Sequence, residues 1–265
     1  MSHHPVGAPG AIHIVLQSKG GVGKSFVALH LAQHFTNQGL PTAVFDSDPA
    51  TPTLAHYQAL RARYINFMLD DDLDVRQFDV LANEIVEASR QVVVLDTGSS
   101  NFIPLVSYLK SNRILEVFAE LGRRVVIHSV LVGGAGARET LAGLVATAEN
   151  LPAYGYVAWL NSFFGPVVFE GKQLEETRAF GRVRDKLVGV VRIRQRGGSS
   201  NVLHLNAMRE MTSRYLTYNE ALPSPEFTLW DRQRLREAQR EIDEQLVEIF
   251  GRDDEVQSST AVAAH

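Results

Sequence analysis

Two lysines stand in one glycine-rich stretch near the start of the chain, residues 15–25, which reads VLQSKGGVGKS. Glycines at positions 20, 21 and 23 would let the backbone approach a ligand closely, because they carry no Cβ. Successive N–H groups that lead into a helix N-terminus suit a polyphosphate. Lys24 would then reach the terminal phosphates, and the Ser25 hydroxyl would bind Mg²⁺. The stretch predicts a phosphate-binding loop, and Lys19 is left as a second cation that needs its own explanation.

Carboxylates follow two apolar runs further along the chain. Asp46 and Asp48 stand in VFDSDPA, and Asp96 stands in VVVLDTGSS. Any one of them could be an ordinary helix cap or a solvated strand end. Ligands of open α/β sheets bind beyond the carboxyl ends of the strands, and Mg²⁺ prefers oxygen ligands. Three carboxylates in such places after a phosphate loop therefore favour a metal-dependent site.

Short β-branched runs alternate with segments of helical periodicity. The expected strands are 12–17, 42–46, 92–96, 125–132, 156–161 and 188–193, and they lack the polar alternation of a half-exposed strand. The expected helices are 24–38, 53–63, 75–89, 104–109 and 137–149, and the chain after Gly197 is helical in pattern. This order predicts an α/β fold with a single doubly wound, mostly parallel sheet and helices on both faces. We expect a flexible segment at 1–10, one domain at 11–250 and a disordered tail at 251–265.

The composition is that of one large globular domain, with 265 residues, 45% of them hydrophobic and 21% charged. A net charge of −4 argues against a protein that coats nucleic acid with its whole surface. The absence of cysteine excludes disulfides and thiolate chemistry. No apolar stretch is long enough for a signal sequence or a membrane span. We therefore expect a cytoplasmic protein that does not insert into membranes.

The loop KGGVGKS resembles the deviant Walker A loop of the ParA and MinD ATPases, although Ser18 replaces the first glycine of the standard pattern. The resemblance implies ATP and Mg²⁺ as cofactors. It implies a homodimer in which Lys19 reaches the partner's nucleotide while Lys24 holds its own. Asp48 would orient the attacking water. The implied nucleotide-binding residues are Gly20, Gly21, Val22, Gly23, Lys24, Ser25 and Phe26, and the implied metal site consists of Ser25, Asp46 and Asp96.

The segment AWLNSFF, at 158–164, follows an expected strand and is the place for base recognition. Ser162 and Phe164 stand where a GTPase of this class would have a lysine and a guanine-reading aspartate, so adenine is favoured. Asn161 is a candidate adenine contact, and a strand-end turn residue is an equally good interpretation of it.

Longer stretches over residues 12–223 resemble the TraL-type conjugal transfer proteins of plasmids, among them FDSDPATPTLAHYQAL and LDTGSSNFIPLVSYL. This resemblance implies a switch ATPase that serves conjugal DNA transfer, with conjugation proteins as partners. Two alternatives are a plasmid partition or stability ATPase, and an ATP-gated scaffold with little hydrolysis. The transfer step and the hydrolysis rate do not follow from the sequence.

Two further segments allow more than one interpretation. The first is basic, with Arg178, Arg182, Arg184, Lys186, Arg192, Arg194 and Arg196 against Asp185. It could contact DNA non-specifically, protect a sheet edge or contact the nucleotide. The second is an amphipathic C-terminal segment with Phe227, Trp230, Leu235, Ala238, Ile242, Leu246 and Ile249 on one face. Its polar face is slightly acidic, so docking on the core or on a partner is favoured over membrane binding.

Overall fold

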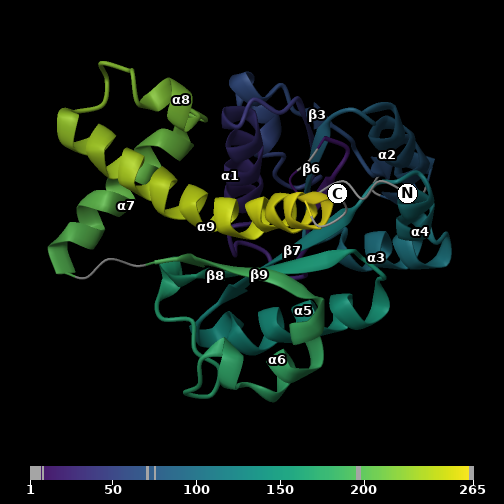
Figure 1. Ribbon diagram of the computed structural model, residues 1–265. Coiled ribbons are helices and arrows are strands. Elements are labelled where there is room, and N and C mark those ends of the chain that lie inside the picture. The colour runs from purple at the N-terminus through teal and green to yellow at the C-terminus, as the bar shows by residue number, and fades with distance from the viewer. Residues whose placement is uncertain (1–6, 8, 70–71, 75, 195–197, 263–265) are drawn as a thin grey trace.

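A seven-stranded parallel sheet forms the centre of the computed structural model, which describes residues 7, 9–69, 72–74, 76–194 and 198–262. Figure 1 shows the sheet enclosed between helices. The strand order is β3 (Arg63–Tyr64), β2 (Thr42–Ser47), β6 (Val92–Thr97), β1 (Ile12–Val15), β7 (Val125–Val132), β8 (Gly155–Asn161) and β9 (Leu187–Ile193). A small hairpin of β4 (Met68–Leu69) and β5 (Asp72–Leu73) stands apart from it. Most of the predicted flexible N-terminus, residues 1–6 and 8, lies outside the described residues, as do residues 263–265.

Each face of the sheet has its own apolar core. On β1, Ile12 and Ile14 point into one core while Val15 points into the other. The first core lies under α2 (Arg76–Glu87), α3 (Phe102–Ser111), α4 (Ile114–Glu120), α5 (Ala137–Asn150) and α6 (Arg178–Val183). The second core lies under α1 (Lys24–Asn37) and α9 (Leu229–Val262). Because both faces are covered, the strands need apolar residues throughout, as predicted.

The strand β1 lies at the point where the direction of winding reverses. From β1 the chain crosses the position of β6 to form β2 and β3, and it then returns to form β6 between β2 and β1. It continues on the other side of β1 through β7, β8 and β9. The strands are parallel, so their carboxyl ends meet at one edge of the sheet. Ligands bind at such a switch point in doubly wound folds.

The six predicted strands are confirmed, whereas the predicted helix at 53–63 is wrong. Two short 3₁₀ turns, Leu54–His56 and Gln58–Leu60, and the strand β3 replace it. Tyr57 lies between the turns in an extended conformation with ψ 99° and is 2% exposed. Burying this ring takes a backbone bend that a continuous helix does not allow. The short helices α4 and α6 and the β4–β5 hairpin were not predicted.

The last three helices form an arm with its own core and then return over the sheet (Figure 1). The arm consists of α7 (Gly198–Ser213), α8 (Tyr218–Ala221) and the first turns of α9. The predicted docking of the amphipathic segment on the core is confirmed, since Leu235, Ile242 and Leu246 are buried, although Trp230 is 67% exposed. The helix continues to Val262, within the segment where the sequence predicts a disordered tail. In the described part of the chain no helix has the length and apolarity to cross a membrane.

Candidate functional site

The phosphate loop connects β1 to α1 and is braced from the end of β8. Gly23 has φ 102°, which favours glycine, and a Cβ there would lie 2.8 Å from Nδ2 of Asn161. That same Nδ2 donates to the Val22 carbonyl at 2.8 Å. The Oδ1 of Asn161 accepts from the backbone N–H of Phe163 at 3.0 Å. Asn161 therefore holds the phosphate loop in place. Its contact with a nucleotide base remains a prediction.

Lys24 is the first residue of α1 and points back into the loop. Its side chain is buried, and its Nζ donates to the Lys19 carbonyl at 3.2 Å. Burial lowers the pKa of Lys24, while the carboxylates of Asp96 and Asp48 act in the opposite direction. The predicted phosphate-binding lysine thus lies at a helix N-terminus, in the field of two of the predicted carboxylates.

Asp96 is the carboxylate whose surroundings best fit a bound cation. It is paired in register with Val15 on one side and Asp46 on the other, at the end of β6. Its side chain is 0% exposed, and apart from the nearby Ser25 hydroxyl, whose hydrogen bond lowers the pKa, its oxygens have no hydrogen-bond partner among the described residues. Burial raises the pKa of Asp96 to about 7, against the opposing effects of the nearby Ser25 hydroxyl and of Lys24. Buried carboxylates normally have a full set of hydrogen bonds, so a buried carboxylate with so few donors around it fits a bound cation.

The described residues contain no cluster of three or more histidine, cysteine or acidic side chains that could hold a metal ion by themselves. Mg²⁺ keeps several waters and takes one or two protein ligands together with substrate phosphates. Ser25 and Asp96 would hold such an ion, which stabilises negative charge on transferring phosphates.

Asp46 and Asp48 order the loop that follows β2. The Oδ1 of Asp46 accepts from the Asp48 N–H at 3.0 Å, and its Oδ2 accepts from the N–H groups of Leu54 and Ala55 at 2.8 and 3.2 Å. Burial raises the pKa of Asp46. The Oδ1 of Asp48 accepts from Ala50 and Thr51. Both oxygens of Asp46 are thus engaged, and its place in a metal shell and the water-orienting role of Asp48 remain predictions.

Lys19 is tied to α5. Its Nζ lies 2.7 Å from Oε2 of Glu139, in an ion pair in which both side chains are partly exposed. Gly136 allows this approach, because a Cβ there would lie 3.0 Å from Cε of Lys19. Sequence reasoning missed Glu139. The sequence feature that could have pointed to Glu139 is the GGAG turn at 133–136 just before it, but such a turn by itself indicates only a tight connection between a strand and a helix.

Three buried polar side chains that the sequence analysis also missed connect the ends of the central strands. The hydroxyl of Thr97 donates to the Val15 carbonyl at 2.7 Å, and that of Ser47 donates to the Asp96 carbonyl at 3.0 Å. Asn101 donates to the Ser47 carbonyl at 2.6 Å. These bonds connect the carboxyl ends of β1, β2 and β6, where the phosphate loop and Asp96 lie.

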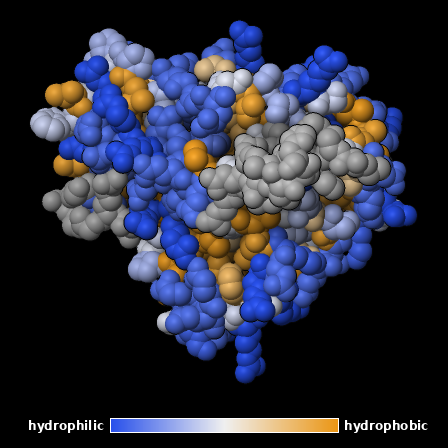
Figure 2. All heavy atoms as spheres, viewed as in Figure 1, coloured by the Kyte–Doolittle hydropathy of each residue, from blue (hydrophilic) through white to orange (hydrophobic). Residues whose placement is uncertain are grey.

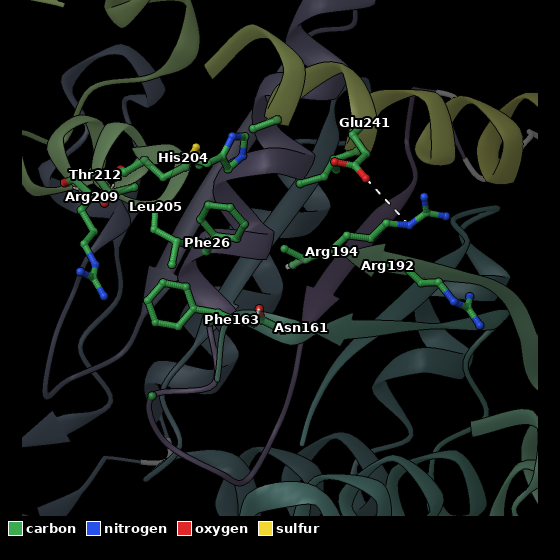
Figure 3. Close-up of a pocket in the computed structure, with 16 residues that line it drawn as sticks. Phe26, Asn161, Phe163, Arg192, Arg194, His204, Leu205, Arg209, Thr212 and Glu241 are labelled. Carbon is green, nitrogen blue, oxygen red and sulfur yellow. Dashed lines mark hydrogen bonds and ion pairs between the residues drawn. The ribbon is translucent and has the colours of Figure 1, made fainter. Parts of the chain in front are cut away.

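A largely apolar cavity of about 270 Å³ opens beside the loop. Figure 3 shows side chains from α1, α7, α9 and the ends of β8 and β9 around it. Its lining includes Gly21, Gly23, Phe26, Asn161, Phe163, Ile193, Leu205, Met208, Ala238 and Ile242. Arg194 reaches it from the end of β9 and lies 3.9 Å from Glu241. The predicted nucleotide residues Phe26 and Asn161 therefore share one cavity next to the predicted phosphate site.

The basic segment is extensively paired with acidic side chains. Arg182 forms an ion pair with Glu149, and Arg192 with Glu175. Arg192 and Arg194 also line the cavity, which agrees with the nucleotide-contact interpretation. Arg196 lies outside the described residues, and DNA binding remains a prediction.

Residues 13–241 match the family described as the CobQ/CobB/MinD/ParA nucleotide binding domain, and the chain belongs to this family of α/β nucleotide-binding proteins. The predicted family and fold class are confirmed. Two proteins from Escherichia coli named Protein TraL are each 35% identical to it. The first alignment covers 89% of this chain and 96% of the relative. The second covers 85% of this chain and 92% of the relative. Among solved structures, the MinD cell division protein of Aquifex aeolicus has 12% identity and a TM-score of 0.47, over 87% of this chain and 95% of that one.

Proposed function

We propose that the chain is a Mg²⁺-dependent ATPase that dimerises around two ATP molecules and acts as a switch in plasmid conjugal transfer. One observation carries the nucleotide part of this proposal. The buried carboxylate of Asp96 lies next to Ser25 and Lys24, where the phosphate loop enters α1, and apart from the Ser25 hydroxyl its oxygens have no hydrogen-bond partner among the described residues. A cation with attached phosphates would satisfy all three side chains.

Within one subunit, each side chain has a distinct task. Lys24 and the N–H groups of the loop would bind and orient the β- and γ-phosphates. Asp48 would accept a hydrogen bond from the attacking water and align it with the γ-phosphorus. The cavity beside the loop would take the base. An ATP-gated scaffold would keep all of these features except the alignment of water, so hydrolysis must be measured separately from binding.

Dimerisation is proposed from the resemblance of the loop around Lys19 to the deviant Walker A loop of the ParA and MinD ATPases. This cation lies at the loop but pairs with Glu139 on α5, while Lys24 occupies the inner position. A second lysine of this kind fits a phosphate of another subunit, where it would neutralise charge during transfer.

Light scattering with Mg-ATP tests the dimer. We expect Asp48→Ala to accumulate as an ATP-bound dimer, because binding is kept and hydrolysis is lost. Lys19→Ala should stay monomeric while still binding ATP. Equal masses for the two variants would contradict the sandwich arrangement.

The role in conjugation is proposed from the similarity to the TraL proteins and is tested in cells. Donor-to-recipient transfer frequency and plasmid retention are measured in one strain pair, with Lys24→Ala against wild type. We expect transfer to fall while retention holds. A fall in retention with normal transfer would support the partition or stability ATPase instead.

A further inference from the structure

The wall of the cavity next to the phosphate loop contains two phenylalanines, Phe26, which also packs against the second core and the core of the arm, and Phe163, which is 38% exposed. Phe26 directly follows Ser25 in the first turn of α1, and Phe163 lies in the turn after β8. Figure 3 shows both rings directed into the cavity, with Leu205 beside them. Aromatic rings in such a place offer flat faces to a planar ligand.

Each ring is held in place from behind. The Phe26 ring packs against His30, with 4.2 Å between ring centroids. The backbone N–H of Phe163 donates to Asn161, so the same amide that braces the phosphate loop also positions this ring. The guanidinium carbon of Arg209, on α7, lies 5.5 Å from the centroid of the Phe163 ring. A cation at this distance contacts one π face of the ring, so the opposite face is the one on which a ligand would stack.

The polar side chains at the cavity are largely engaged with other groups. Asn161 bonds to Val22 and Phe163, Arg194 lies near Glu241, and the Thr212 hydroxyl donates to the Met208 carbonyl within α7. The remaining lining combines aliphatic side chains, among them Ile193, Leu205 and Ile242, with the polar residues Arg192, His204 and Glu241. Shape and stacking are therefore available to hold a ligand along the apolar part of this wall.

We propose that Phe26 and Phe163 form an aromatic clamp that holds the nucleotide base by stacking, with Asn161 and Arg209 as positioning residues. This inference rests on the proposed function, because it assigns the base to the same cavity. It adds that the affinity for the base comes from ring faces, and that Asn161 connects the base clamp to the phosphate loop. Stacking of one base on an aromatic side chain corresponds to roughly a 5- to 150-fold change in affinity.

The test compares two ligands that share phosphates but not the base. Binding of Mg-ATP and of Mg-tripolyphosphate to the full chain is measured by calorimetry for wild type, Phe163→Ala, Phe163→Tyr and Phe26→Leu. We expect Phe163→Ala to weaken ATP binding about 5- to 150-fold. Phe26→Leu should weaken it in the same direction, and Phe163→Tyr should keep wild-type affinity. Tripolyphosphate affinity should stay within about twofold of wild type for every variant, because that ligand makes no contact with the clamp.

Tyr154→Ala provides a matched control, because Tyr154 precedes β8 as an exposed aromatic residue with Arg124 stacked 4.2 Å from its ring centroid. It should change neither affinity. An equal loss of both ligands in Phe163→Ala would overturn the clamp, since it would indicate a distorted phosphate loop. Unchanged ATP affinity in both phenylalanine variants would overturn it as well. Failure of the proposed function is a different result, in which wild type binds neither ligand more tightly than Lys24→Ala does.

Discussion

The ammonium group of Lys19 lies 2.7 Å from a carboxylate oxygen of Glu139, although the two residues are 120 positions apart in the chain. The phosphate loop and the start of α5 are thereby connected on the side of the molecule that carries the candidate site. A lysine that is to bind a phosphate of a second subunit must first leave this carboxylate. The ion pair therefore competes with the proposed dimer.

Substituting Glu139→Gln should make nucleotide-dependent dimerisation easier. Partly exposed ion pairs contribute about 0.2–1 kcal/mol, so the ATP concentration at half-maximal dimer should fall about 1.5- to 5-fold. Light scattering over an ATP titration measures this change. Glu170→Gln, which removes the exposed partner of Arg138 on the same helix, is the control and should behave as wild type. A half-maximal concentration that is unchanged in Glu139→Gln would show that the pair does not restrain Lys19.

Substituting Asp96→Asn should stabilise the free protein while it weakens Mg²⁺-dependent nucleotide binding. The pKa of Asp96 in the folded state, about 7, lies above the ordinary value of 3.8. The folded state therefore disfavours the ionised carboxylate, and above pH 7 this charge lowers the free energy of unfolding by its full amount. Removing the charge should raise Tm by roughly 2–8 °C at pH 8 without metal. Calorimetry with EDTA measures the rise, and nucleotide titrations with and without Mg²⁺ measure the loss. The exposed Asp185→Asn serves as the control. A lower Tm for Asp96→Asn would contradict the conclusion that the buried charge of Asp96 destabilises the free protein.

His30 should make the protein less stable in mild acid. Its Nδ1 lies 2.8 Å from the Phe26 carbonyl, which can only accept, so Nδ1 carries the proton and Nε2 accepts from the Tyr218 hydroxyl at 2.9 Å. Burial lowers the pKa of His30 from 6.5 to about 4. The folded state therefore binds fewer protons than the unfolded state between these values, and stability falls as pH drops from 6.5 to 4, by about 3 kcal/mol in total.

Urea denaturation between pH 4 and pH 8 measures this effect, with His30→Gln against wild type. The variant should show a shallower decrease in the free energy of unfolding over this range, whatever its stability at pH 8. His56→Gln, at an exposed histidine, should retain the wild-type slope. Parallel curves for His30→Gln and wild type would show that His30 titrates normally.

Gln245 should protect the open edge of the sheet. Its side-chain amide accepts from the Arg192 N–H at 2.8 Å and donates to the Arg192 carbonyl at 3.2 Å, as a neighbouring strand would do. Hydrophobic groups reach the surface just below α9, over β9 (Figure 2). An exposed apolar edge strand can pair with a second molecule, so this edge favours unwanted self-association. Gln245→Leu should lower the free energy of unfolding by about 1–3 kcal/mol and increase self-association without nucleotide.

Denaturation and sedimentation velocity measure the two effects. Gln239→Leu, on the same helix in the groove beside Arg236 and Arg240, is the matched control. If Gln245→Leu stays monomeric with wild-type stability, the amide does not protect the edge.

Local patterns were sufficient for the parts of the fold that short stretches specify. The run VVIHSVLV at 125–132 is β7 with the predicted bounds, because continuous β-branched residues suit a strand buried on both faces. The segment around Tyr57 was predicted wrongly as a helix, because its apolar spacing resembles helical periodicity while a distant core site requires an extended backbone there. The predicted start of α1 at Lys24 agrees with the structure, since three glycines precede an uninterrupted helical sequence.

The sequence by itself determined the phosphate loop, the aspartates at the strand ends and the family, because these depend on residue types at close spacing. Only the tertiary structure decided which groups are engaged. Asp46 bonds to the backbone while Asp96 remains open, Asn161 braces the loop, and Lys19 pairs with Glu139. Phe163 became a candidate only when β8, α1 and α7 were seen to enclose one cavity. Such contacts join segments far apart in the chain, and their geometry follows from how the helices pack on the sheet, which no local pattern encodes.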